Sequence, residues 1–233
     1  MELIDEEIDK IMVEKLLPIH NKLINFSPYS ALKQEIPEQL MTCKLIREND
    51  NILELGGSIG RNSCVINSIL KNKNKHVVIE PSIIEANKLI INRDQNKLDY
   101  QIEISAISSH RLYSKGWLTY KENVSGAKEI NIINYNDLYN KYNIPFNVLI
   151  IDNEGNFVDM LKSFPNILDN IRLLIIEHDF NSESDLDYFN QTLKKNNFSM
   201  TTKYMKNAKY GPGMNWSDGI ISDPIFVSGW ERE

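Results

Sequence analysis

The chain has 233 residues, of which 42% are hydrophobic and 25% are charged, and its net charge is −6. These values are typical of one globular protein with a sizeable core, and an acidic chain without a dense Lys/Arg stripe disfavours nucleic acid as its main partner, because phosphate binding needs clustered positive charge. Two cysteines make no disulfide scaffold, no apolar run is long enough for a membrane span and residues 1–10 lack the order of a signal peptide, so we expect a cytoplasmic protein without a membrane partner.

Residues 1–48 are expected to form a helical extension ahead of the first strand. Apolar residues recur at helical spacing along residues 1–25, which predicts an amphipathic helix interrupted near Pro18. Residues 28–48 predict one or two further helices, with Pro37 near a helix start. These helices either cap a cofactor or only cover the edge of a sheet, and apolar residues on their exposed side are compatible with a homodimer.

The most informative stretch is residues 51–60, where a short apolar run ends in a glycine-rich turn. A helix-like segment, residues 61–70, follows, and a strand, a turn and a helix N-terminus in this order commonly hold a nucleotide-like cofactor. Gly56 and Gly60 stand where a side chain would block the ligand or where the backbone must be left-handed. The pattern Glu54-x-Gly56-x-x-x-Gly60 differs from the Gly-x-Gly-x-x-Gly of dinucleotide oxidoreductases. It resembles the first motif of Rossmann-like S-adenosylmethionine-dependent methyltransferases.

From residue 51 onward, strand-like and helix-like segments alternate. Nearly all-apolar strands in such an alternation predict an α/β fold with a parallel sheet covered by helices on both faces. The last two strands are joined without a helix, which predicts an antiparallel edge. After the first strand, the expected strands are residues 77–80, 100–105, 117–120, 130–133, 147–151, 172–176, 198–205 and 225–230. The expected helices are residues 83–92, 136–142 with Asn136 as its cap, 157–168 and 184–196.

Four of the expected core strands carry an acidic residue at their carboxyl end, namely Glu54, Glu80, Asp152 and Glu177. Ligands of open parallel sheets bind beyond these ends, so the pattern favours a functional rim. Glu80 is expected to accept both ribose hydroxyls of a cofactor, and the alternative is a solvated acid. Glu54 either holds the methionine end of the cofactor, directly or through water, or fixes the turn by accepting backbone N–H groups. Ala106 and Ile107, after the third strand, are candidates for lining an adenine site.

The second informative stretch is residues 150–155, where two carboxylates follow a buried strand. Asp152 and Glu154 either face the cofactor and an acceptor hydroxyl, with a carboxylate of raised pKa as general base, or cap the following helix. His178 is a further candidate base, because an imidazole beside carboxylates can take a proton near neutral pH, and its alternative is a structural hydrogen-bonding role. Asp152 and His178 also fall near Glu177 and Asp179, but no ligand spacing compels a metal site, so we predict none.

The polar, glycine-rich loop at residues 210–219 has the composition of a substrate loop. Glycines permit movement, and aromatic rings stack on sugars or other rings. Tyr210, Trp216 and Asp218 are therefore candidate substrate-binding residues. The alternative is a surface loop without a contact role.

Together these stretches resemble the FkbM family of S-adenosylmethionine-dependent methyltransferases. The resemblance implies a Rossmann-like, seven-stranded, mostly parallel sheet with an antiparallel last strand, formed by residues 49–233 as the methyltransferase domain. It also implies cofactor contacts from Glu54, Gly56, Gly60 and the Glu80–Pro81 pair, active-site roles for Asp152 and Glu154, and methylation of hydroxyls, often on sugars. The stretches that carry it are residues 52–60 (ILELGGSIG), 78–81 (VIEP), 133–138 (INYNDL), 149–155 (LIIDNEG) and 174–177 (LIIE).

We therefore predict transfer of a methyl group from S-adenosylmethionine to a hydroxyl of a sugar, a glycan or another small molecule. The transfer is an in-line displacement, assisted by a side-chain base. Methylation of an amine is an alternative. A nucleotide-sugar or dinucleotide oxidoreductase is disfavoured because its glycine pattern is missing. A non-catalytic cofactor-binding module would keep the glycine turn but has no need of the acidic strand ends.

Overall fold

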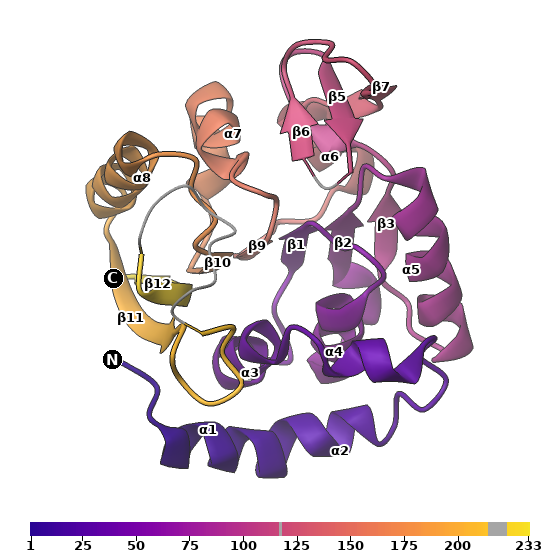
Figure 1. Ribbon diagram of the computed structural model, residues 1–233, viewed down its shortest axis with the longest axis vertical. Coiled ribbons are helices and arrows are strands. Elements are labelled where there is room, and N and C mark those ends of the chain that lie inside the picture. The colour runs from indigo at the N-terminus through magenta and orange to yellow at the C-terminus, as the bar shows by residue number, and fades with distance from the viewer. Residues whose placement is uncertain (117, 214–222) are drawn as a thin grey trace.

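The computed structural model describes residues 1–116, 118–213 and 223–233. At its centre lies a seven-stranded sheet of order β11-β12-β10-β9-β1-β2-β3 (Figure 1). All neighbouring strands pair in parallel except β12, which is antiparallel to both β10 and β11. The predicted Rossmann-like sheet with an antiparallel last strand is confirmed. Its strands are β1 (Ile52–Leu55), β2 (His76–Ile79), β3 (Gln101–Glu103), β9 (Val148–Ile151), β10 (Leu173–Glu177), β11 (Phe198–Met205) and β12 (Ile225–Arg232).

Helices cover both faces of the sheet, because alternate residues of a buried strand point to opposite sides. On one face Ile52 and Ile150 lie in a hydrophobic cluster with helices α1 to α5. On the other face Leu53 and Ile151 lie in a second cluster with α6 to α8. The first layer contains α1 (Asp5–Ile11), α2 (Leu17–His20), α3 (Ile36–Leu45), α4 (Arg61–Ile69) and α5 (Ile83–Gln95), and the second contains α6 (Tyr135–Tyr142), α7 (Phe157–Ser163) and α8 (Glu183–Lys195).

The N-terminal helix continues through Pro18, so the predicted interruption is wrong. A π-helical segment, Met12–Leu16, follows α1 directly and leads into α2, with Pro18 in the first turn of α2. Proline lacks the N–H that would bond to the preceding turn, and the wider π-helical turn just before it accommodates that loss. Ile8 and Leu16 bury this helix against the same hydrophobic cluster as the sheet.

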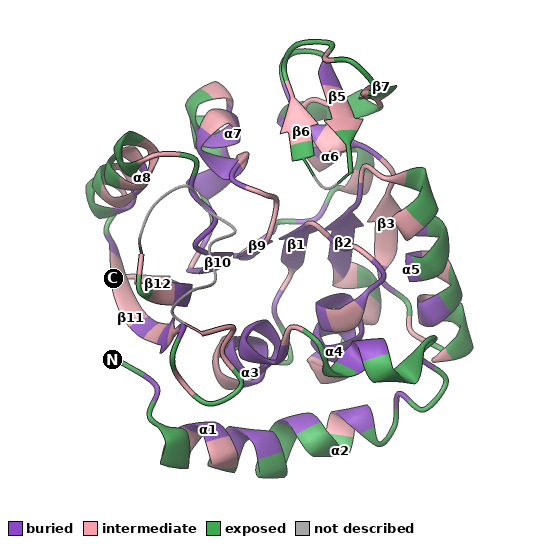
Figure 2. Cartoon of the chain, viewed as in Figure 1, coloured by how far each residue is buried: buried purple, intermediate pink, exposed green. Residues whose placement is uncertain are grey.

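The helices expected over residues 28–48 are a 3₁₀ segment, Tyr29–Lys33, and α3, with Pro37 in the first turn of α3 as predicted. α3 does more than cover an edge. All side chains of residues 36–43 are buried (Figure 2), and the helix contacts α4, β10 and β12. The N-terminal segment therefore forms part of the wall above the carboxyl ends of the strands.

One other expectation is wrong in detail. The cap of α6 is Asn134, whose side chain accepts a hydrogen bond from the backbone N–H of Asn136. The helix begins earlier than predicted because the ring of Tyr135 is buried and belongs to its first turn. The last two strands form the predicted antiparallel edge: β11 is the edge strand, and β12, whose residues 226–230 are all buried, lies between β10 and β11.

Residues 104–133 form two small sheets outside the main sheet. Within them β4 (Ala106–Ile107) pairs in parallel with β8 (Ile132–Ile133), while β5 (Leu112–Lys115), β6 (Leu118–Tyr120) and β7 (Lys128–Ile130) form a small antiparallel sheet that projects at the top of Figure 1. An antiparallel excursion is thus confirmed here, although the first residue of the predicted strand at 117–120 lies outside the described part of the chain. No helix among the described residues combines the length and the apolar character of a membrane span.

Candidate active site

The acidic strand ends meet at one edge of the sheet. The pairing places Leu55 beside both Ile79 and Ile151, and Ile151 beside Ile176. Because these strands are parallel, the residues that follow them emerge on the same side. The residues brought together there are Glu80 after β2, Asp152 after β9, and Glu177, the last residue of β10. The predicted rim therefore exists as a spatial cluster.

The glycine turn fits closely against the end of β9. Gly56 has φ +90°, and a Cβ atom placed on it would lie 1.6 Å from the backbone oxygen of Asp152. Gly60 has φ +94°, precedes the first residue of α4, and leaves room for the side chains of Leu89 and Tyr100. Both positions therefore require glycine. Glycine is required at position 56 for two reasons: the left-handed conformation that the sequence predicts, and the close backbone oxygen of Asp152, directly after β9.

Glu80 links the second strand to this turn. Its carboxylate accepts hydrogen bonds from the backbone N–H groups of Ser58 and Ser82, each at 2.7 Å. The side chain is buried. Burial raises the pKa of Glu80 to about 7, although the two backbone hydrogen bonds oppose the shift. Pro81 follows directly and leads into α5, whose N-terminal cap is the side chain of Ser82.

Glu54 has a partner that the sequence analysis did not identify. Its Oε2 lies 2.9 Å from Nε2 of His76, on the neighbouring strand, and both side chains are buried. His76 carries no motif signal, and only the register of β1 and β2 brings the two together. Glu54 also lines a small recess of about 20 Å³ beneath the glycine turn, which is room for about one water molecule.

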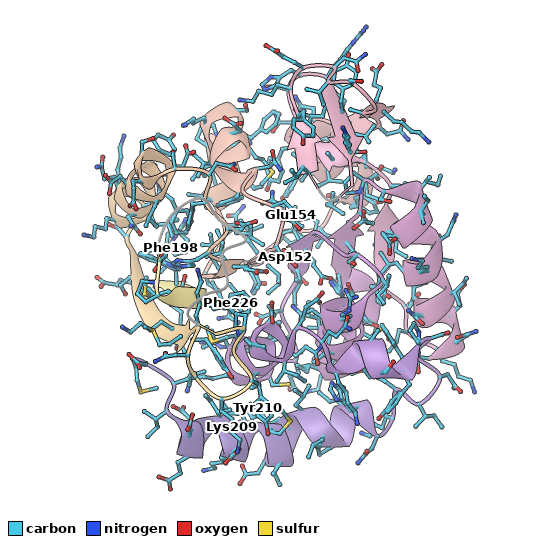
Figure 3. The ribbon with its side chains drawn as sticks, in the orientation of Figure 1. Asp152, Glu154, Phe198, Lys209, Tyr210 and Phe226 are labelled. Atoms are coloured by element: carbon cyan, nitrogen blue, oxygen red, sulfur yellow. The ribbon has the colours of Figure 1, made fainter. Side chains whose placement is uncertain are left out.

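A larger cavity of about 530 Å³ adjoins this recess, and both are lined by Glu35, Glu38, Asp152 and Glu177. In Figure 3 Asp152 and Glu154 lie at the end of β9, and Phe226 lies between Asp152 and Tyr210 in this view. Three predicted residues line this cavity: Asp152 and Glu154, expected in the active site, and Tyr210, expected to bind substrate. The lining consists of Lys33, Gln34, Glu35, Ile36, Pro37, Glu38, Asp152, Glu154, Glu177, Asp179, Tyr210, Pro212 and Phe226.

Three non-glycine residues of this lining have a left-handed backbone: Glu35 (φ 56°), Glu154 (φ 55°) and Tyr210 (φ 66°). Such conformations cost free energy, and they persist where the surrounding structure holds them, often at functional sites. After Glu154, the backbone N–H of Gly155 donates to the Asp179 carboxylate at 2.5 Å. This bond ties the loop after β9 to the loop after β10.

The carboxylates of the cavity sit in a poorly solvated, acidic environment. Burial raises the pKa of Glu38 to about 8, and the charge of Glu35 adds to the effect. Burial likewise raises the pKa of Asp152 and of Glu177 well above their usual values, with neighbouring carboxylates as the further cause. Carboxyl groups of this kind can take or release a proton near neutral pH.

Glu35 and Glu38 are acidic residues of the cavity that were not predicted from the sequence. Both belong to the start of α3, which lies far from the strand ends in sequence. Burial raises the pKa of Glu35 as well, although Arg61, whose Nη1 lies 2.7 Å from its carboxylate, opposes the shift. A signal existed in the sequence: two acids flank Pro37 at a helix start, next to a strongly apolar run.

His178 is placed differently from the carboxylates. Its Nδ1 lies 2.7 Å from the carboxylate of Asp223 and its Nε2 lies 2.7 Å from Oγ of Ser228, which also accepts a hydrogen bond from the indole of Trp230. Burial alone would raise the pKa of Asp223, but the hydrogen bond to His178 holds this pKa below its usual value. Both ring nitrogens are therefore engaged, one by Ser228 on β12 and one by Asp223 just before it, and His178 is not part of the cavity lining.

The remaining predicted site residues lie elsewhere or outside the described part of the chain. Ala106 and Ile107 form β4, which pairs with β8, and Ile107 is buried. Trp216 and Asp218 lie outside the described residues, so the structure gives no account of them. Within the described ranges, no three His, Cys, Asp or Glu side chains are arranged to hold a metal ion.

No protein-family model matches the chain, and no curated protein matches it in sequence. Among solved structures, the chain is similar to an O-methyltransferase from Bacillus cereus in complex with SAH, at 12% identity and a TM-score of 0.52, with 92% of this chain and 91% of that chain covered. It is also similar to an rRNA methylase from Streptococcus thermophilus, at 9% identity and a TM-score of 0.50, covering 84% and 94%. A protein of the NADB-Rossmann superfamily from Streptococcus agalactiae shows 8% identity and a TM-score of 0.51, covering 84% and 67%. At these identities the likeness shows the Rossmann-like fold, and the FkbM resemblance is not confirmed.

Proposed function

We propose that this protein is an S-adenosylmethionine-dependent methyltransferase. One observation carries the proposal: the glycine turn after β1 is hydrogen-bonded to Glu80, which follows β2, and the same turn lines the recess that shares Glu35, Glu38, Asp152 and Glu177 with the acidic cavity. A cofactor site and an acceptor site thus adjoin at the carboxyl ends of the strands. The fold similarity to an O-methyltransferase solved with SAH supports the same function.

The residues at the turn fit this cofactor. Glu80 is a buried carboxylate with one backbone donor on each oxygen, and each oxygen keeps a lone pair that can accept a ribose hydroxyl. The backbone of Gly56 and Gly57 lines the recess without side chains. Ala106 and Ile107 remain our candidates for the adenine. Bound here, S-adenosylmethionine supplies an electrophilic methyl group to the acceptor.

The role of the protein in the reaction is to orient the acceptor and remove its proton. We propose Asp152 or Glu154 as the base, because both line the acceptor cavity. The raised pKa of Asp152 makes its carboxylate a stronger base than an exposed one. Alignment of acceptor and methyl group inside an enclosed site contributes up to about 7–11 kcal/mol in favourable cases. His178, bonded through both ring nitrogens, is better suited to holding β12 and the Asp223 segment.

For the acceptor we propose a hydroxyl of a sugar, a glycan or a similar small molecule. Tyr210 offers a ring for stacking at the cavity, and the FkbM resemblance implies the same acceptor class. The likeness to an rRNA methylase raises nucleic acid as a second acceptor. The carboxylates of the cavity oppose this reading, because they would repel phosphate groups.

Calorimetric titration with S-adenosylhomocysteine tests the cofactor, with NAD and NADP as controls. We expect binding of S-adenosylhomocysteine alone, weakened by the substitution Glu80→Gln, which removes the charge but keeps the shape. Binding of NAD in its place would contradict the proposal and favour a dinucleotide oxidoreductase. If none of the three binds, the non-catalytic module becomes the better account.

A further inference from the structure

The acceptor cavity holds more carboxylates than methyl transfer requires. One base is enough for the reaction, yet the lining includes carboxylates from α3 and from the ends of β9 and β10: Glu35, Glu38, Asp152, Glu154, Glu177 and Asp179. The groups that act most strongly on the Asp152 carboxylate are all carboxylates too. Like charges brought together in a buried site destabilise the fold, so a cationic ligand beside Glu38, Asp152 and Glu177 would be stabilising.

Glu38 shows most directly that a partner is missing. The side chain is only 6% exposed, lines both the recess and the cavity, and its Oε2 has no hydrogen-bond partner among the described residues. A buried carboxylate oxygen is normally hydrogen-bonded or paired with a charge. The free oxygen therefore points to a donor that arrives with a ligand.

The cations of the protein near this cavity are already engaged or lie at its mouth. Arg61 bonds to Glu35 and also to Ser58 in the glycine turn. Lys33 lines the cavity but is exposed, and its ammonium lies 5.6 Å from the centre of the Tyr29 ring. Neither of them is hydrogen-bonded to Glu38, although the charge of Arg61 acts weakly on this carboxyl group; a bound cation would supply the direct partner.

The shape of the cavity favours an organic cation over a metal ion. Among the described residues, no three acidic or histidine side chains converge at a metal-binding geometry, and the volume of about 530 Å³ is that of a small-molecule site. Apolar and aromatic groups complete the lining, in particular Phe226 and Tyr210. Such surfaces suit the carbon skeleton of an amine and interact with its charge through the ring face.

We propose that the acceptor carries a protonated amine, which binds between Glu38, Asp152 and Glu177 while a neighbouring hydroxyl faces the methyl group. The substrate class is then an amino alcohol or an amino sugar, rather than a neutral sugar. This inference rests on the proposed methyltransferase function of the same site. The raised pKa of Glu38 agrees with it, because a carboxyl group that lacks a counter-charge retains its proton until a cation binds.

Two small molecules of matched length test the proposal: 1,4-diaminobutane, which carries two positive charges, and 1,4-butanediol, which carries none. Each is titrated by calorimetry into the full chain saturated with S-adenosylhomocysteine, with Mg²⁺ as a third ligand. We expect the diamine alone to bind, and Glu38→Gln to weaken it by about tenfold or more. Gln resembles the neutral form of the carboxyl group, so this variant should fold. Glu122→Gln, which changes an exposed carboxylate outside the cavity, serves as the matched control and should bind like the wild type.

The other outcomes overturn either the cationic acceptor or the proposed methyltransferase function. Equal binding of diol and diamine, binding of Mg²⁺ alone, or no binding of the diamine would overturn the cationic acceptor while leaving the cofactor result untouched. Competition between S-adenosylhomocysteine and the diamine would assign the carboxylates to the cofactor and also overturn it. Diamine binding that needs Glu38, in a protein that does not bind S-adenosylhomocysteine, would support the cation site and refute the methyltransferase function. Glu80→Gln separates the two, since it should weaken only the cofactor.

Discussion

The affinity for the cofactor should depend on pH through Glu80. The pKa of this carboxyl group is raised to about 7 by burial, and ribose hydroxyls that donate to it favour its ionised form. Binding is then coupled to loss of a proton below pH 7, so the affinity should rise with pH. With a pKa of about 7 the ionised fraction falls from about nine-tenths at pH 8 to about one-tenth at pH 6, so the apparent dissociation constant should increase about tenfold, or about 1.4 kcal/mol.

Calorimetry with S-adenosylhomocysteine at pH 6, 7 and 8 measures this dependence. Buffers of different ionisation enthalpy should show release of up to one proton at pH 6 and almost none at pH 8. The variant Glu80→Gln should bind more weakly at pH 8 and lose the pH dependence over this range. Equal affinity of the wild type at pH 6 and pH 8, or tighter binding at pH 6, would refute the assignment of Glu80 to the ribose.

Three further predictions concern stability, measured by urea denaturation and thermal melting. Gly56→Ala should lower the free energy of unfolding by about 3 kcal/mol or more, because the new Cβ would overlap the backbone oxygen of Asp152, directly after β9. Gly213→Ala, with φ +93° but nothing within 4 Å, should cost only about 1–2 kcal/mol. Equal losses would contradict this reason. Arg172→Ala should cost about 3 kcal/mol, because it leaves the buried Asp50 carboxylate without its ion-pair partner; a loss below 1 kcal/mol would show that the remaining donors to Asp50 suffice. The stability that a protonated Glu38 provides is fully present below about pH 4.5 and lost as the pH rises through about 8. Glu38→Gln should therefore melt at a higher temperature than the wild type at pH 8 and at nearly the same temperature at pH 4.5. A lower melting temperature of the variant at pH 8 would contradict the raised pKa.

The parallel sheet could be predicted because each of its core strands has a recognisable local pattern of apolar residues. Residues 148–151 are wholly apolar and residues 52–55 are apolar except for Glu54, which is typical of strands buried on both faces. The glycine turn was equally visible, since Gly56 and Gly60 both have a left-handed backbone. The position of β12 was not visible, because insertion between β10 and β11 depends on long-range pairing and not on local pattern.

The candidate site was predictable only where it lies on the strand ends. Asp152 and Glu154 follow β9 directly, and the topology of a parallel sheet brings them to the binding edge. Glu38 and His76 needed the three-dimensional structure. Glu38 reaches the cavity because α3 packs over β10 and β12, and His76 meets Glu54 through the register of two strands. Contacts of this kind follow from packing, which no spacing along the chain encodes.

A crystal structure of the complex with S-adenosylhomocysteine tests the central claim most directly. The distance to measure is the one between the ribose hydroxyls and the Glu80 carboxylate, together with the direction in which the sulfur faces. We predict hydrogen bonds from both hydroxyls to Glu80, the homocysteine along the turn at Gly56, and the sulfur open to the cavity at Asp152. Density for the ligand away from this turn, or a sulfur closed off from the cavity, would contradict it.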